Sequence, residues 1–357
     1  MMGGGRLLIY GANGYTGALV ARYAAERGLD PILAGRSAAA VDAVARKHGF
    51  DVRIFGLDVP STLDANLDGV GCVLHCAGPF SRTSKPMVDA CLRSRVHYLD
   101  VTGELEVFEA TARRHSEAEA AGVMLMPGCG FDVVPSDCLA LHVASLVPGA
   151  KRLELAFRGV GGGMSHGTAT TMVESLPKGS WVRRGGKLEK VRPGSLTRKV
   201  DFGRGPTLAM AIPWGDLGTA WRSTGIPDIT VYTAADRAVV TGAWVMGWVP
   251  RVVGSKPVQA FMKRRVDGRP AGPTDEQLES GVSLLWARAE NDQGLAAESR
   301  LTGPQGYKLT ALASLNIAEK VLRGELVTGY QTPATAYGAD LVLEIEGVTR
   351  DDVLRPE

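Results

Sequence analysis

A glycine-rich turn near the N-terminus reads Gly11-Ala12-Asn13-Gly14-Tyr15-Thr16-Gly17. The apolar run 7–10 before it is typical of a buried strand, and 18–24 after it has the pattern of a helix. A dinucleotide-binding unit begins in this way: Gly11 permits a sharp turn, Gly14 lets the backbone approach a diphosphate, and Gly17 lets the helix pack on the strand. The helix N-terminus would offer N–H groups to the phosphates. We therefore expect these seven residues to bind a dinucleotide, with a plain tight turn as the alternative.

The end of the second predicted strand, 31–34, indicates which dinucleotide. Gly35, Arg36 and Ser37 follow it, about twenty residues beyond the turn, where the fold places its ribose-reading residue. A carboxylate there reads the free 2′-hydroxyl of NAD, whereas a guanidinium pairs with the 2′-phosphate of NADP. Arg36 therefore favours NADP(H), unless it only caps the strand end. Asp58, after the third strand, is expected at the adenine edge.

Three further loops follow predicted strands at 70–76, 97–99 and 123–126. Ligands of such sheets gather beyond the carboxyl ends of the strands. We therefore expect these loops to complete the cofactor site through Ala77, Gly78, Pro79, Phe80, Thr102, Gly103 and Cys129. From residue 153 the pattern changes to antiparallel strands, including a hairpin turn at 291–294.

The composition of the 357 residues, with 45% apolar and 22% charged residues, is typical of a globular protein with two domains. The five cysteines are odd in number, form no C-x-x-C pair and follow no signal peptide, so we expect reduced thiols in a cytoplasmic protein. Cys72, His75 and Cys76 lie in an apolar strand with His75 on the opposite face. Buried thiols are therefore favoured there, and no metal site is expected.

The middle of the chain is basic, because residues 151–304 carry 22 Lys and Arg against 14 Asp and Glu. This excess indicates an anionic partner: a phosphorylated or CoA-like substrate, an acidic carrier domain or an anionic membrane surface. A solvated hairpin over 178–204 without a partner is the alternative. Nucleic acid is not expected, because no nucleic-acid-binding motif accompanies the charge. A homodimer remains open.

The run 238–249 is strongly apolar, and Trp244 and Trp248 lie four residues apart within it. Twelve residues are too few to span a bilayer. A buried helix or a substrate lid is our first interpretation. A membrane-surface element, peripheral at the bilayer and assisted by nearby basic residues such as Arg251 and Lys256, is the second.

Six stretches resemble the saccharopine-dehydrogenase-like oxidoreductases, more narrowly the branch that includes the trans-acting enoyl reductases of bacterial polyketide and lipid assembly. They are 11–17, 34–36, 77–80, 98–104, 127–137 and 329–334. The resemblance implies an α/β fold: a Rossmann-type doubly wound parallel sheet with an inserted α+β substrate domain on a largely antiparallel sheet. It also implies NADPH as cofactor. The Rossmann domain is expected over 1–148 and a returning segment, 305–357, with the inserted domain over 149–304.

Hydride transfer also needs a proton donor near the strand ends. His166 lies on the glycine-rich loop 161–168, which opens a helix and offers N–H groups to an anion or a carbonyl oxygen. Tyr98 and Asp132 are the other candidate catalytic residues, and with Cys129 they are expected to face the nicotinamide. A helix N-cap or loop brace is the alternative for Asp132.

Three functions follow from these patterns. The first is an NADPH-dependent reductase acting on a polarised C=C bond of a hydrophobic, small-molecule or carrier-bound acyl substrate. The second is a C=N reductase or amino-acid dehydrogenase of the saccharopine kind. The third is a non-catalytic NADP-binding protein at a membrane or lipid surface.

Overall fold

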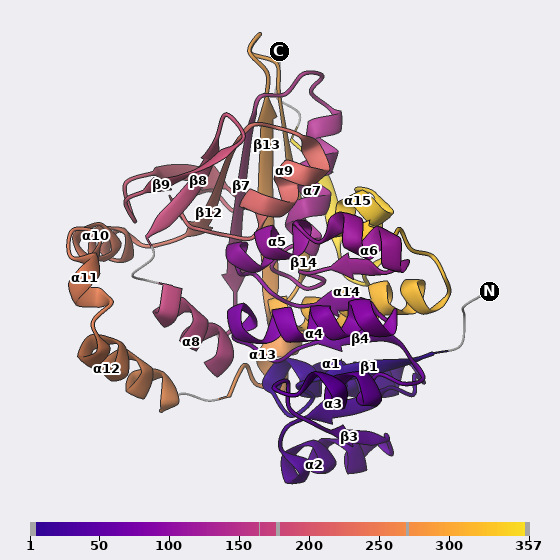
Figure 1. Ribbon diagram of the computed structural model, residues 1–357. Coiled ribbons are helices and arrows are strands. Elements are labelled where there is room, and N and C mark those ends of the chain that lie inside the picture. Colours follow the sequence, from indigo (N-terminus) through magenta and orange to yellow (C-terminus); the bar gives the residue numbers. More distant parts are fainter. Residues whose placement is uncertain (1–4, 164, 176–178, 269–270, 354–357) are drawn as a thin grey trace. The chain divides into compact units, whose positions relative to one another are not determined.

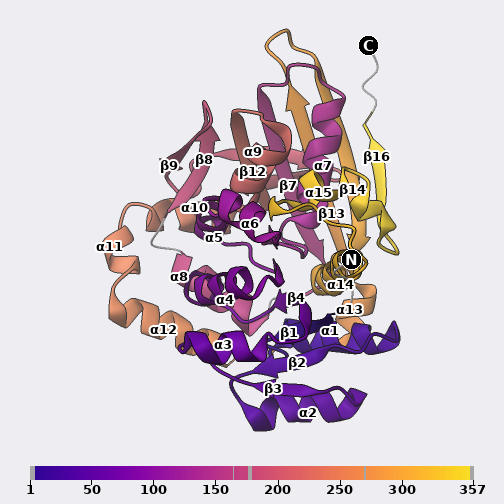
Figure 2. The same cartoon turned by 45° about the vertical axis from the view of Figure 1, so that its right-hand side comes forward.

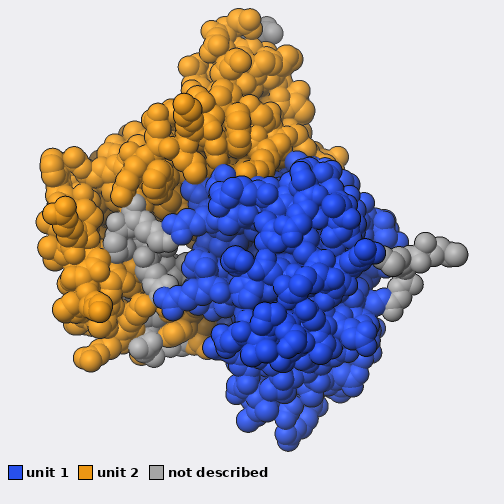
Figure 3. Space-filling view, in the orientation of Figure 1, with its two compact units in different colours: residues 1–134, 307–337 blue, residues 135–306, 338–357 orange. Residues whose placement is uncertain are grey.

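The computed structural model describes residues 5–353 except 164, 176–178 and 269–270 (Figure 1). The chain divides into two compact units, which are coloured separately in Figure 3. Unit 1 comprises residues 1–134 and 307–337, and unit 2 comprises residues 135–306 and 338–357.

Unit 1 is built on a seven-stranded sheet whose paired strands are all parallel. Its order, β15-β6-β5-β4-β1-β2-β3, contains the Rossmann order and confirms the predicted fold class. The strands are β1 (Arg6–Tyr10), β2 (Ile32–Gly35), β3 (Val52–Ile54), β4 (Val70–His75), β5 (His97–Asp100), β6 (Met124–Met126) and β15 (Gly329–Tyr330). The helices are α1 (Tyr15–Glu26), α2 (Ala38–His48), α3 (Pro60–Asn66), α4 (Phe80–Ser94), α5 (Leu105–Ala112), α6 (His115–Ala121), α14 (Gly306–Leu322) and α15 (Pro333–Tyr337).

The central strands of this sheet are buried on both faces. Leu8, Ile9 and Leu74 are fully buried, as is most of β1 and β4. Parallel strands covered by helices on both sides require side chains that are apolar at nearly every position. This requirement explains why these strands were recognisable as continuous apolar runs.

The last strand of this sheet, β15, comes from the far end of the chain. It pairs parallel to β6, in the register Gly329–Met124 and Tyr330–Leu125. The backbone N–H of Tyr330 also donates to Nδ1 of His115 in α6, at 3.1 Å. Gly329 has φ +88°, a left-handed conformation that glycine adopts without strain. The segment therefore closes the edge that β6 would otherwise expose.

Unit 2 is built on a nine-stranded sheet in which only β7 and β12, among the described strands, pair in parallel. The strands are β7 (Arg152–Val160), β8 (Ser180–Arg184), β9 (Lys187–Val191), β10 (Thr197–Asp201), β11 (Pro206–Ala211), β12 (Asp228–Ala234), β13 (Val282–Glu290), β14 (Ala296–Pro304) and β16 (Thr349–Asp352). The helices are α7 (Val134–Ser145), α8 (His166–Ser175), α9 (Asp216–Thr224), α10 (Arg237–Met246), α11 (Pro250–Val253), α12 (Lys256–Asp267) and α13 (Asp275–Ser280), with a 3₁₀ helix at Leu341–Glu344. The largely antiparallel α+β unit is thus confirmed.

The hairpin predicted at 291–294 joins β13 to β14. Oδ1 of Asn291 accepts hydrogen bonds from the N–H groups of Gln293 and Leu295, both at 3.0 Å, which fixes the turn. The predicted returning segment 305–357 is divided, since 307–337 belongs to unit 1 and 338–357 to unit 2. The reason is β16, which pairs antiparallel with β14 and so completes the second sheet (Figure 2).

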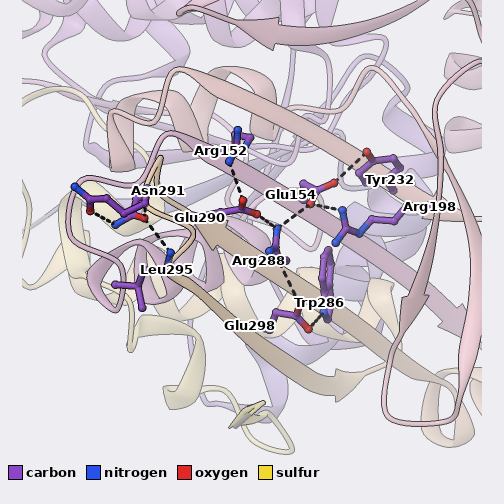
Figure 4. Close-up of polar contacts among 11 residues, drawn as sticks. Arg152, Glu154, Arg198, Tyr232, Trp286, Arg288, Glu290, Asn291, Leu295 and Glu298 are labelled. Carbon is purple, nitrogen blue, oxygen red and sulfur yellow. Dashed lines mark hydrogen bonds and ion pairs between the residues drawn. The ribbon is translucent and has the colours of Figure 1, made fainter. Parts of the chain in front are cut away.

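A row of ion pairs crosses the strands of the second sheet (Figure 4). Arg288 pairs with Glu290, with Glu154 at 3.8 Å and with Glu298 at 3.3 Å. Glu154 also pairs with Arg198, and Glu290 with Arg152 at 2.7 Å. Three arginines are thus balanced by three glutamates of the same region, across β7, β10, β13 and β14, so the basic excess of residues 151–304 is carried by other side chains.

The apolar run 238–249 forms a helix, α10, but the prediction that this helix is buried is wrong. None of the residues of α10 is buried, and Val239 and Val245 are each 53% exposed. Only a narrow stripe of the helix meets the rest of unit 2: a Cβ placed on Gly194 would lie 2.6 Å from the carbonyl oxygen of Val240. Apolar composition alone could not distinguish a buried helix from an exposed one.

Candidate functional site

The glycine turn forms a cradle that side chains would fill. Gly11 has φ +83° and its N–H donates to the carbonyl of Ala34 at 2.8 Å, while α1 begins directly after Gly14. A Cβ on Gly17 would lie 2.3 Å from the carbonyl oxygen of Gly11. A Cβ on Gly11 would lie 2.8 Å from the Cβ of Ala77. Only backbone fits at these positions, as a diphosphate against the start of α1 requires. In the same turn Ala12 is buried, Asn13 is exposed, and Tyr15 and Thr16 open the helix.

Arg36 and Ser37 follow β2 and Asp58 follows β3, and all three residues are exposed. Arg36 and Asp58 both act on the hydroxyl of Tyr10, which donates to the carbonyl of Phe55 at 3.1 Å. Burial raises the pKa of Tyr10 to about 12; the charge of Arg36 opposes this rise and the charge of Asp58 adds to it. Both predicted ribose and adenine residues therefore lie at the same end of the sheet.

The end of β2 meets the glycine turn directly. A Cβ on Gly35 would lie 3.1 Å from Oδ1 of Asn13 and 3.0 Å from Val41. A side chain at Gly35 would therefore push Asn13 or α2 away. The structure brings the predicted phosphate residues and the predicted ribose residues together.

Glu104 joins the loops that follow β4 and β5. Its carboxylate accepts hydrogen bonds from the N–H groups of Phe80, at 2.8 Å, and Ser81, at 2.9 Å. These N–H groups open α4, where a negative charge is favourable. The loop at 77–80, which contains a cis peptide between Gly78 and Pro79, is also fixed by Thr83, whose hydroxyl donates to the carbonyl of Ala77 at 2.6 Å.

Asp100 joins the loops that follow β5 and β6. Oδ1 accepts from the N–H groups of Thr102 and Gly128, both at 2.9 Å, and Oδ2 accepts from the hydroxyl of Tyr98 at 2.7 Å. The Asp100 carboxyl is fully buried, and burial raises its pKa to about 6, although these three donors oppose the rise. The sequence analysis did not predict that Asp100 holds these two loops together. The signal in the sequence was an acidic residue at the end of an apolar strand.

Tyr98 and Cys129 lie inside the protein. Both side chains are fully buried, and burial raises the pKa of each well above its usual value. The Tyr98 hydroxyl is engaged by Asp100, and the Cys129 thiol donates to the carbonyl of Met126 at 3.1 Å. This geometry favours a structural role for both residues over contact with a nicotinamide.

Asp132 lies where the loops 102–104 and 128–132 meet. A Cβ on Gly103 would lie 2.5 Å from Oδ2 of Asp132, so the carboxyl packs on glycine backbone. The residue Asp132 is half-buried, and burial of its carboxyl raises the pKa to about 7. A carboxyl with such a pKa is suited to give or take a proton near neutral pH. Asp132 is therefore the strongest catalytic candidate in unit 1.

The start of α14 also contributes to this side of unit 1, which the sequence did not indicate. The ring of Tyr307 meets the ring of Tyr15 edge-on, with centroids 5.2 Å apart. The hydroxyl of Thr310 accepts from the N–H of Phe131 at 3.0 Å. A segment distant in the chain thus supports both the glycine turn and the loop that bears Asp132.

His166 belongs to unit 2, where it is the first residue of α8 and is exposed. Its N–H donates to the carbonyl of Ala271 at 3.0 Å, and Ser165 Oγ accepts from the N–H of Thr168 at 3.2 Å, which caps the helix. Met164, in the same loop, lies outside the described residues. The expected approach of His166 to a nicotinamide stays a prediction.

Two features are absent from the described ranges. No cluster there of His, Cys, Asp and Glu side chains could hold a metal ion. No helix there is both long enough and apolar enough to cross a bilayer.

Comparison with known proteins identifies the first domain. Residues 7–126 match the family model of the saccharopine dehydrogenase NADP binding domain. Unit 1 therefore contains a saccharopine-dehydrogenase-type NADP-binding domain. This match confirms the predicted resemblance and the predicted NADP(H). The glycine turn and the exposed guanidinium of Arg36 fit that cofactor, since the first lets the start of α1 lie close to the turn, where its N–H groups can bind a diphosphate, and the second can pair with a 2′-phosphate.

Two curated relatives match 49% and 37% of the chain. A protein of Mycobacterium tuberculosis named, provisionally, as a trans-acting enoyl reductase is 35% identical over 187 residues, which are 49% of this chain and 45% of that protein. A trans-acting enoyl reductase of Mycobacterium leprae is 37% identical over 139 residues, 37% of this chain and 33% of the relative. The match thus spans less than half the length of each relative.

Among solved structures, an apo saccharopine dehydrogenase (L-Glu forming) from Saccharomyces cerevisiae is similar over almost the whole chain. The TM-score is 0.68 at 13% sequence identity, covering 98% of this chain and 100% of the other. At this identity the similarity establishes the fold alone.

Proposed function

We propose that the protein is an NADPH-dependent reductase of a polarised C=C bond in a hydrophobic acyl substrate. The observation that carries the proposal is Asp132, a carboxyl with a pKa of about 7 that lies at the strand ends of an NADP-binding domain. The names of the mycobacterial relatives support the choice of a C=C bond.

The residues of unit 1 have distinct tasks in this reaction. Reduced nicotinamide, when bound, supplies a hydride. The backbone of Gly11–Gly17 binds the diphosphate, and Arg36 pairs with the 2′-phosphate. Reduction of a C=C bond next to a carbonyl also consumes one proton, at the carbon adjacent to the carbonyl. Asp132 in its protonated form donates that proton, directly or through a water molecule.

A second candidate is reduction of a C=N bond, as in a dehydrogenase of the saccharopine kind. The fold similarity over 98% of the chain supports this alternative. Imine reduction needs protonation at nitrogen rather than at carbon, which the same carboxyl can provide. The third candidate, NADP binding without catalysis, requires no role for Asp132.

The test uses the purified full chain, NADPH and two substrate classes: medium-chain enoyl thioesters and imines formed from an amino acid and a 2-oxo acid. We expect NADPH binding in a fluorescence titration and NADPH oxidation with the enoyl thioesters. Turnover of imines alone would favour the second candidate. Tight NADPH binding without turnover of either class would favour the third, and failure to bind NADPH would exclude all three.

The variant Asp132→Asn assigns the proton donor. We expect kcat/KM to fall about 10²–10⁴-fold and its dependence on pH near 7 to disappear, because the amide cannot donate as a carboxylic acid does. NADPH affinity should be unchanged. Asp68→Asn, at an exposed carboxyl on the β3 side of the sheet, is the matched control. Equal turnover of the two variants would remove Asp132 from the mechanism.

A further inference from the structure

Residues 237–265 cover α10, α11 and all but the last two residues of α12, and they have an unusual charge; the acidic residues Asp236 and Asp267 flank them. The range contains six basic residues and no acidic one; they are Arg237, Arg251, Lys256, Lys263, Arg264 and Arg265. All of them except Lys263 are exposed. Figures 1 and 2 both show the three helices as a run beside α8. We call residues 237–265 the basic–apolar segment.

This segment also concentrates exposed apolar side chains. Of the fifteen large apolar side chains that are exposed among the described residues, eight lie in it, with exposed fractions between 37% and 59%: Val239, Trp244, Val245, Met246, Trp248, Val249, Val252 and Phe261. Single exposed apolar residues are ordinary, but a local concentration indicates an interaction surface.

Specific contacts hold the segment on unit 2. The guanidinium of Arg192, in the turn between β9 and β10, lies 3.6 Å from the centre of the Trp248 ring and 5.8 Å from that of Trp244. Gln259 Nε2 in α12 donates to the carbonyls of Val173 in α8, at 3.2 Å, and Val253 in α11, at 2.9 Å. The exposed tryptophans are therefore presented from an ordered base.

The combination of protruding apolar side chains, paired tryptophans and a local excess of positive charge fits an anionic lipid surface. Insertion of Trp and Val side chains at the boundary between headgroups and acyl chains lowers the free energy, and Lys and Arg attract anionic headgroups. Fluid acyl chains adapt to side chains that protrude separately from three short helices, whereas a folded partner needs a surface of matching shape. The observations therefore favour a membrane over an acidic carrier domain.

We propose that the basic–apolar segment is a membrane-docking surface that binds the protein peripherally to anionic bilayers. Basic residues provide long-range attraction, which salt screens, and the apolar side chains insert at the interface. The proposal is independent of the chemistry proposed for unit 1.

The test is sedimentation of the full chain with phosphatidylcholine vesicles, with and without a quarter of phosphatidylglycerol. We expect binding to the anionic vesicles that is weakened by salt, and little binding to the neutral ones. The charge variant Arg251→Glu/Arg264→Glu should lower the partition coefficient at least about tenfold. The apolar variant Val252→Ser/Phe261→Ser should lower it to a similar degree.

Matched controls separate this surface from a general effect of charge or hydrophobicity. Arg46→Glu/Lys47→Glu makes the same charge change on α2, and Val52→Ser/Ile54→Ser removes exposed apolar side chains from β3. Both should bind vesicles as the unmodified chain does. The circular dichroism spectra of the segment variants should match that of the unmodified chain, which shows that they fold, and their NADPH titration should be unchanged.

Two results would overturn the proposal. The first is failure of the unmodified chain to bind anionic vesicles at low salt. The second is equal vesicle binding by the segment variants and their controls; if only the segment variants then lose binding to an acidic acyl carrier domain, the surface belongs to a protein partner.

Discussion

The hydroxyl of Tyr98 donates a hydrogen bond to Oδ2 of Asp100 across 2.7 Å, and both side chains are fully buried. The other oxygen of the same carboxyl accepts from the N–H groups of Thr102 and Gly128. The Asp100 side chain thereby fixes the two loops that meet at Asp132. Its importance for the site is indirect, through the position of the loops.

Asp100→Ala should lower the free energy of unfolding by about 3–5 kcal/mol, because two N–H groups and one hydroxyl lose their acceptor. Tyr98→Phe removes one of these donors and should cost about 1 kcal/mol. Urea unfolding followed by circular dichroism measures both. Similar losses for the two variants would show that the loops do not depend on the carboxyl.

Gly17→Ala should impair both folding and cofactor binding. The added Cβ would lie 2.3 Å from the carbonyl of Gly11, so α1 has to move away from the turn. We expect a loss of about 1–3 kcal/mol in stability and at least about tenfold weaker NADPH binding. Gly242→Ala in α10, where a Cβ meets nothing within 4 Å, is the control and should leave both quantities unchanged or slightly improve stability. A Gly17→Ala protein with unaltered NADPH affinity would contradict the cradle.

Arg36→Ala should reduce the preference for NADPH over NADH. Loss of charge-assisted bonds to the 2′-phosphate should raise the Kd for NADPH about 10–100-fold and leave the Kd for NADH nearly unchanged. Fluorescence titration with both cofactors measures the effect, with Arg46→Ala as a control at a nearby exposed arginine. A parallel loss of affinity for both cofactors would place Arg36 elsewhere than at the 2′-phosphate.

His75 should make the protein sensitive to acid. Its ring is fully buried against Tyr10 and Phe80, with centroids 5.3 and 5.5 Å away, and neither nitrogen has a hydrogen-bond partner among the described residues. Burial lowers its pKa to about 3. Because the folded pKa lies below the unfolded value of about 6.5, this residue's contribution is constant above pH 6.5 and is lost as pH falls from 6.5 towards 3.

His75→Phe should therefore flatten the decline of stability with acid by an amount on the order of a few kcal/mol. Chemical unfolding at a series of pH values from 7 to 4 measures it. His166→Phe, at an exposed position, is the control and should retain the slope of the unmodified chain. An unchanged slope in His75→Phe would show that acid acts through other groups.

The strands of unit 1 could be predicted because parallel strands covered on both faces demand continuous apolar sequence, as at 7–10 and 70–76. The glycine turn and the position of Arg36 after β2 could be predicted because both follow from the local sequence, whereas the pairing of Arg36 with a 2′-phosphate stays a prediction. Asp100, Glu104 and Thr310 could not, because each supports a loop through hydrogen bonds to residues distant in the chain. The exposure of α10 could not either, since composition predicts a helix but not which surface covers it.

The strand β15 has a consequence for how the protein is made. The backbone passes between the two units three times, at 134–135, 306–307 and 337–338. During synthesis the first sheet therefore waits, with β6 at an open edge, until residues 329–330 have left the ribosome. A fragment that ends at residue 134 would keep that unpaired edge and should aggregate, whereas a fusion of 1–134 to 307–337 should give a well-behaved protein.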